Sequence, residues 1–119
     1  MIENRDKAIN YIEFAVKDMA QTKAFYQTVF GWQYTDYGPG YCEFNDGQMK
    51  GGFEVADTVQ PGGALVVLYG TDLEALQQAV ADAGGTITRT VFSFPGGERF
   101  QFQDPNGHEL AVWRTVDAA

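Results

Sequence analysis

The sequence repeats one pattern twice, and this repeat constrains the fold more than any other feature. The stretch YIEFAVKDMAQTKAFYQTVFGWQ begins at Tyr11, and LVVLYGTDLEALQQAVADAGGTI begins at Leu65, which is 54 positions later. Each stretch opens with an apolar strand pattern, meets an aspartate and continues as a helical pattern that ends at glycine. Self-similarity at a fixed offset predicts two copies of one structural unit.

Both predicted helices have recognisable start signals and apolar stripes. Asp18 with Gln21, and Thr71 with Glu74, match the pattern of a capping box, and Gly31 is placed for a left-handed C-terminal cap. Apolar residues at helical spacing predict the side of each helix that packs on the core. These residues are Leu73, Leu76, Val80 and Ala83 in the second helix, and Phe25, Val29 and Phe30 in the first.

Three short strand patterns follow each helix. They are WQYTDY, YCEFN and GGFEVA in the first half, and TITRTVF, RFQFQ and ELAVWR in the second. The predicted class is therefore α+β: two tandem βαβββ modules, residues 7–58 and 62–115, in one domain over 1–119, forming a curved mixed sheet around a shared cleft. The two modules can pair within one chain or by exchange in a homodimer, and we expect a homodimer.

Composition limits the partners of the chain. Of the 119 residues, 45% are hydrophobic, which suffices for a core, and the net charge of −8 disfavours nucleic acid. The sequence lacks the apolar run of a membrane span and the apolar centre of a signal peptide, so we expect a cytoplasmic protein with no membrane partner. Cys42 is the single cysteine and is predicted to be a small buried side chain.

The repeat, the order F-Y then F-G-W at the end of the first helix, and D-P-N-G-H-E before the last strand together resemble the vicinal oxygen chelate superfamily. This superfamily includes glyoxalase I, bleomycin-resistance proteins and extradiol dioxygenases. The resemblance covers about Ile9 to Arg114, and the chain most resembles small bacterial glyoxalase-like proteins.

In metal-dependent members of that superfamily, a divalent ion is held by His, Gln or Glu on the first and last strands of each module. By position, the corresponding residues are Tyr11, Gly52, Leu65 and Ala111, and this set does not predict a metal or any other cofactor. An alternative hypothesis is that Glu13 and Glu54 together hold a hard cation loosely. We prefer the interpretation that they are polar wall residues of a metal-free cleft. His108 is predicted to lie exposed in the DPNG turn, and Glu109 on the strand face opposite to the ligand position. The metal site is therefore predicted to be absent.

The alternation of side chains between the two faces of each strand then predicts an apolar and aromatic cleft. We expect Ile12, Phe14 and Val16 to pack on the first helix, and Gln101 to face the cleft while Phe100 faces the core. The predicted ligand-binding residues are Tyr11, Glu13, Glu54, Leu65, Tyr69, Gln101, Ala111 and Trp113.

The preferred function is metal-free binding of a small aromatic or cationic molecule. Three alternatives remain open: a metal-dependent lyase, isomerase or dioxygenase with unusual ligands, a metal-independent enzyme with Glu13 as general base, and a partner-interaction module. Whether any reaction is catalysed is left open.

Overall fold

The computed structural model describes residues 3–60, 63–105 and 107–116 of the chain. Contacts divide the chain into two compact units, one built mainly from Asn10–Leu65 and one from Asn4–Ile9 together with residues 66–116. Gly62, where the second predicted module begins, and Asn106 of the predicted turn lie outside the described residues.

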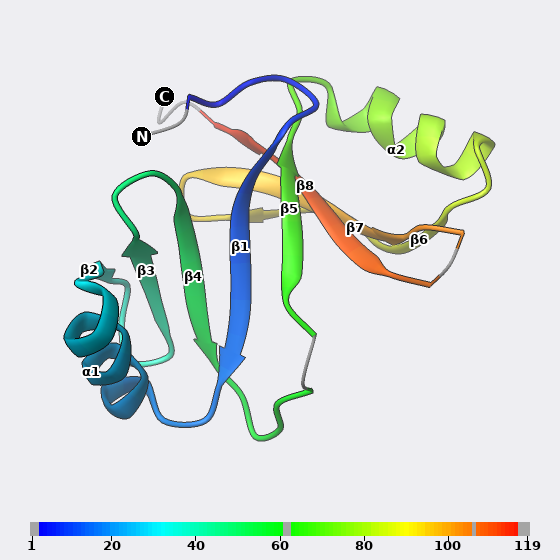
Figure 1. The fold of residues 1–119 in the computed structure, drawn as a ribbon. Coiled ribbons are helices and arrows are strands. Elements are labelled where there is room, and N and C mark those ends of the chain that lie inside the picture. Colours follow the sequence, from blue (N-terminus) through cyan, green and yellow to red (C-terminus); the bar gives the residue numbers. More distant parts are fainter. Residues whose placement is uncertain (1–2, 61–62, 106, 117–119) are drawn as a thin grey trace. The chain divides into compact units, whose positions relative to one another are not determined.

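The first unit is a four-stranded sheet with one helix (Figure 1). Its strand order is β2-β3-β4-β1, in which β1 runs parallel to β4 and the remaining neighbours are antiparallel. The elements are β1 (Ile9–Val16), α1 (Met19–Phe30), β2 (Gln33–Asp36), β3 (Tyr41–Asn45) and β4 (Lys50–Val55).

The second unit has the same kinds of elements in the same order along the chain. Its strand order is β5-β8-β7-β6, with β5 parallel to β8 and the other pairs antiparallel. The elements are β5 (Leu65–Tyr69), α2 (Leu73–Asp82), β6 (Thr86–Phe94), β7 (Gly97–Gln103) and β8 (Glu109–Thr115). The predicted α+β class is confirmed. Within the described residues, no helix has the length and apolar character that a membrane crossing requires.

Helix α1 begins and ends as the sequence predicts. The Asp18 carboxylate accepts a hydrogen bond from the Gln21 backbone N–H at 2.9 Å, and Gly31 adopts a left-handed φ of 74° at the C-terminal end. The predicted buried stripe is wrong, however. Phe25 and Val29 are each 54% exposed and Phe30 is 61% exposed, whereas Met19 and Tyr26 pack on the sheet.

The reason is that apolar side chains surround most of α1, so spacing alone does not select the face that packs. Tyr26 stacks on the Trp32 ring at 4.5 Å between centroids, and Trp32 stacks on Phe44 at the same distance. This aromatic stack rests on Phe53, which is fully buried. The core of the first unit is therefore formed by aromatic rings between α1 and the sheet.

Helix α2 starts one residue later than the predicted capping box. Asp72, rather than Thr71, is the N-cap, and its carboxylate accepts from the Ala75 backbone N–H at 3.0 Å. Thr71 instead donates its backbone N–H to the Asp6 carboxylate at 3.0 Å. The predicted stripe of α2 is correct for Leu73, Leu76 and Val80, which pack on the core of this unit with Phe100 and Val112, whereas Ala83 is exposed.

Candidate functional site

The face of β1 that points away from the first unit's core carries the first candidate residues. Phe14 and Val16 belong to the aromatic core on the helix side, as predicted. Successive side chains of a strand alternate between its faces, so Tyr11, Glu13 and Ala15 lie together on the other face. Glu13 is only 9% exposed, which is unusual for a glutamate.

Strand register adds residues from β3 and β4 to this face. Glu13 lies opposite Gly52, which lies opposite Glu43 on β3. In the same way Glu54 lies opposite Tyr41. We name Tyr11, Glu13, Tyr41, Glu43, Gly52 and Glu54 the acidic face of the first unit. Sequence reasoning missed Tyr41 and Glu43, because only long-range pairing brings β3 beside the other two strands.

A chain of hydrogen bonds crosses the acidic face. The Tyr41 hydroxyl donates to Oε2 of Glu13 at 2.9 Å, and the hydroxyls of Tyr11 and Tyr41 are 2.6 Å apart. Burial raises the pKa of both phenols, and for Tyr41 the nearby Glu13 carboxylate raises the pKa further. Both tyrosines therefore stay protonated well above neutral pH and hold the Glu13 carboxylate in place.

Gly52 makes this convergence possible. A Cβ atom at Gly52 would lie 1.9 Å from the Tyr41 hydroxyl oxygen and 2.8 Å from that of Tyr11. The space that a side chain would occupy is thus filled by the two phenol groups. The glycine allows polar atoms from β1 and β3 to meet above the sheet.

A hollow of about 210 Å³ lies beside this network. The sequence predicts Glu13, Glu54 and Leu65 as ligand-binding residues, and all three belong to the lining of this hollow. The full lining is Glu13, Ala15, Glu54, Ala56, Gly63 and Leu65.

The residues at the expected metal positions of this unit do not fit a metal ion. Glycine at position 52 offers no side-chain donor, the space above it holds the two phenols, and the Tyr11 hydroxyl is bonded to Tyr41. Among the residues that the structure describes, no three His, Cys, Asp or Glu side chains are grouped so that they could hold a metal.

The second unit holds the other predicted cleft residues on one face of its sheet. Val67 pairs with Ala111, Tyr69 with Trp113, and Gln101 with Ala111. The Tyr69 and Trp113 rings meet edge to face at 5.1 Å. Phe100 is fully buried in the core, so the predicted alternation of Phe100 and Gln101 is correct. A single cleft shared by residues of both units stays a prediction.

The predicted orientation of Glu109 is wrong. Glu109 pairs with Gln103 and lies two positions before Ala111 on β8, so the two side chains share one face. Its Oε2 atom accepts hydrogen bonds from the Thr88 hydroxyl at 2.8 Å and from the Gln101 amide at 3.3 Å. Glu109 therefore supports the Gln101 side chain rather than pointing to the opposite side of the sheet.

His108 is exposed in the turn before β8, as predicted. Its backbone N–H donates to the Asp104 carboxylate at 3.0 Å, and its carbonyl accepts from the Asp104 backbone N–H at 2.9 Å. These two contacts between Asp104 and His108 close the turn. They give both residues a structural role.

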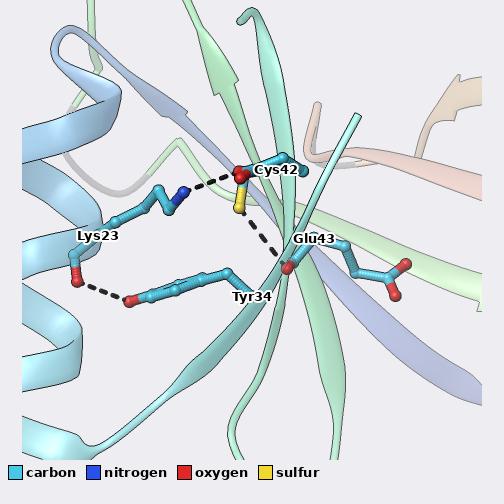
Figure 2. Close-up of polar contacts among 5 residues, drawn as sticks. Lys23, Tyr34, Cys42 and Glu43 are labelled. Atoms are coloured by element: carbon cyan, nitrogen blue, oxygen red, sulfur yellow. Dashed lines mark hydrogen bonds and ion pairs between the residues drawn. The ribbon is translucent and has the colours of Figure 1, made fainter. Parts of the chain in front are cut away.

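Cys42 lies on the opposite, helix-facing side of β3 and is fully buried, as predicted (Figure 2). Its thiol donates to the Glu43 carbonyl at 3.7 Å, and burial together with the adjacent Asp36 raises the pKa of the thiol to about 11. Lys23 pairs with Asp36 at 2.8 Å, and the Tyr34 hydroxyl donates to the Lys23 carbonyl at 2.9 Å. This cluster ties α1 to β2 and β3 and keeps the thiol protonated.

Comparison with known proteins identifies the family. The family described as the Glyoxalase/Bleomycin resistance protein/Dioxygenase superfamily matches residues 8–112. The chain belongs to this superfamily, and the resemblance inferred from its motifs is confirmed.

Individual relatives within this superfamily share only a quarter or less of their residues with the chain. The chain is 25% identical over 123 residues to "Putative glyoxylase CFP32" of Mycobacterium tuberculosis and of Mycobacterium bovis, and the match covers 94% of this chain. It spans about half the length, 47%, of these curated relatives.

Solved structures share the fold. The Mn(II)-bound glyoxalase from Novosphingobium aromaticivorans matches 97% of this chain and 43% of its own at a TM-score of 0.70 and 25% identity. Methylmalonyl-CoA epimerase from Mycobacterium tuberculosis matches 98% of this chain and 94% of its own at a TM-score of 0.77 and 10% identity. At that low identity, the epimerase shows likeness of fold alone.

Proposed function

We propose that this chain binds a compact organic molecule in the hollow of the first unit, and that the binding needs no metal ion. The observation that supports this most directly is the hollow itself, which has apolar walls and two carboxylates beside a hydrogen-bonded pair of tyrosines. A concave site with apolar walls and a few fixed polar groups is the usual form of a small-molecule site.

The volume of the hollow limits the size of the ligand. Typical small-molecule sites measure about 300–1,000 Å³, whereas an apolar cavity of about 150 Å³ accepts benzene. At about 210 Å³, the hollow suits a molecule slightly larger than benzene. Within the first unit alone, large polycyclic or glycopeptide drugs would not be enclosed.

A thermal-shift screen with compact metabolites tests the proposal. A ligand present at 100 times its dissociation constant should stabilise the protein by about 2.7 kcal/mol. Replacing Ala15, which is exposed at the hollow, with phenylalanine should fill the hollow and abolish the shift.

Thr35→Phe is the matched control for this variant. Thr35 pairs with Glu43 and is exposed outside the lining, so this variant should keep the shift.

The metal-free part of the proposal is tested separately, by repeating the screen after dialysis against chelator. A loss of the shift that returns with a divalent metal would contradict it.

The burial of Glu13 supports a second candidate, a metal-independent enzyme with Glu13 as general base. Glu13 lines the hollow, is 9% exposed and is held by the Tyr41 hydroxyl, so a bound molecule would meet a positioned carboxylate. Glu13→Gln keeps the side-chain shape and can still accept from Tyr41. It should abolish turnover and leave ligand binding in place if Glu13 takes a proton from the substrate.

A further inference from the structure

Helix α1 presents an uncharged and largely apolar face to solvent. Phe25, Val29 and Phe30 are each more than half exposed. Lys23 is the only charged residue of this helix, and its ammonium group pairs with Asp36 at 2.8 Å. An isolated exposed apolar residue is ordinary, whereas a group of them on one element marks a site of interaction.

The second copy of the repeat provides an internal comparison for this helix. At the offset of 54 positions, Phe25 corresponds to Ala79 of α2, and Val29 corresponds to Ala83, which directly follows α2. Both alanines are exposed. Each helix packs on the sheet of its own unit, so the shared fold does not explain why only α1 exposes large apolar side chains.

The charged residues of the two helices differ in the opposite sense. Glu74 and Asp82 of α2 are exposed, and the corresponding residues of α1 are Ala20 and Thr28, which are exposed but uncharged. Helix α1 thus has large apolar side chains where the second copy has small ones, and it lacks charge where α2 has carboxylates. Depletion of charge together with enrichment of aromatic residues is typical of the core of a protein interface.

The exposed side of α1 consists of two adjacent rows of side chains at four-residue spacing. The smaller row is Ala20, Ala24 and Thr28, and the larger row is Gln21, Phe25 and Val29. Such rows form ridges, and helices that cross at about −50° place the ridges of one helix in the grooves of the other. About a twofold axis along these rows, the larger row of each helix lies over the smaller row of its partner. This side of α1 is therefore complementary to itself.

Charge also favours a second copy of the chain as the partner. Two chains that each have a net charge of −8 repel one another, so they associate most readily through a surface that brings no carboxylates together. The exposed side of α1 has this property. A membrane surface fits less well, because a helix that lies on a membrane has lysines and arginines beside its apolar side, and the single lysine of α1 is paired.

We infer that the exposed side of α1 binds the same side of a second copy of the chain. This contact would form the predicted homodimer without any exchange of modules. Helix α1 is about 18 Å long, so the interface is small and the association is reversible. Phe14 and Val16 face α1, whereas Ala15 between them lines the hollow, so the contact leaves the hollow open and does not depend on the proposed function.

Sedimentation equilibrium of the full chain, from micromolar to millimolar concentration, tests the inference. The average mass should rise from that of one chain to that of two and then level off, because a twofold contact closes the assembly. Over the same range, the NMR signals of the Ala20, Ala24 and Thr28 backbone amides should shift, and those of α2 should stay unchanged.

Ala24→Glu places a carboxylate in the centre of the proposed contact, and like charges brought together across an interface should weaken the dimer at least tenfold. Ala79→Glu is the matched control, because it adds the same charge to an exposed alanine of α2. It should change the dissociation constant less than twofold. Both variants should keep the urea midpoint of the unsubstituted protein, since both alanines are exposed.

A mixture of Ala24→Glu with Ala24→Lys tests whether the partner of α1 is a second α1. The mixture should associate more tightly than either variant alone, because opposite charges then meet across the twofold axis. Equal association of the mixture and of the separate variants would place the contact elsewhere and overturn the inference. Equal weakening by Ala24→Glu and Ala79→Glu would overturn it too, because net charge alone would then control association. A chain that stays monomeric at millimolar concentration rejects self-association and leaves this side of α1 to a different protein.

Discussion

Tyr41 and Glu13, which are 28 positions apart in the sequence, are joined by a hydrogen bond of 2.9 Å from the phenol hydroxyl to the carboxylate Oε2 atom. The bond connects β3 with β1 across β4, and it places a nearly buried carboxylate at the edge of the hollow. The stability of the acidic face and the form of the candidate site therefore depend on the same contact.

Removing the hydroxyl should destabilise the protein measurably. Tyr41→Phe deletes the donor to Glu13 and the acceptor for Tyr11, and loss of a partner by a buried polar group costs about 1–3 kcal/mol. Urea unfolding should show a lower midpoint with an unchanged m-value. Tyr37→Phe is the control, because Tyr37 is 61% exposed and its change should stay within about 0.5 kcal/mol. Equal stability of the two variants would show that the network contributes nothing.

Gly52 should tolerate no side chain. In Gly52→Ala, the added Cβ would meet both phenol oxygens, and one of them would lie only 1.9 Å away. We expect a loss of about 1–3 kcal/mol from overpacking, or failure to fold. Gly40→Ala is the matched control, since nothing lies within 4 Å of its added Cβ and its φ is not in the left-handed region. That variant should be neutral or slightly more stable in the same urea titration.

Local patterns predicted the parts of this structure that depend on neighbouring residues. The alternation along β1 correctly placed Glu13 away from Phe14, and the Asp18 cap of α1 follows from side-chain chemistry within one turn. The prediction for Glu109 is wrong although alternation along β8 suffices to place this residue, because residues two apart on a strand share a face.

Other parts depend on contacts between distant segments. Tyr41 joins the site only because β3 pairs with β4 and β4 with β1, a register that no local pattern in YCEFN reveals. The packed face of α1 is decided by the stacking of Tyr26 on Trp32, while Phe25 and Phe30, at equally plausible positions, stay exposed. Contacts between distant segments thus decide which residues join the site and which face of α1 packs on the core, and local sequence patterns do not reveal them.

The Cys42 thiol should be unreactive in the folded protein. It is fully buried, and its raised pKa of about 11 leaves roughly a hundredfold less thiolate at pH 8 than an ordinary cysteine would have. Modification by a thiol reagent at pH 8 should therefore be at least a hundredfold slower in buffer than in denaturant. A folded-state rate close to the denatured rate would show that β3 opens readily and would contradict the buried position.

The acidic face should also weaken the protein at alkaline pH. The pKa values of Tyr11 and Tyr41 are raised by burial in the folded state, whereas unfolded tyrosines ionise near pH 10. Their contribution to stability is fully present below pH 10 and is lost as the pH rises above it, because the unfolded chain then releases protons that the folded chain retains. By pH 11 the loss should reach about 1.4 kcal/mol for each tyrosine.

Urea unfolding between pH 9 and pH 11 measures this effect. The decline of the free energy of unfolding should be shallower in Tyr11→Phe than in the unsubstituted protein, because one raised pKa has been removed. Near-ultraviolet absorbance should show that Tyr11 and Tyr41 form phenolate only as the protein unfolds. A phenolate signal from all six tyrosines near pH 10 in the folded state would refute the buried network.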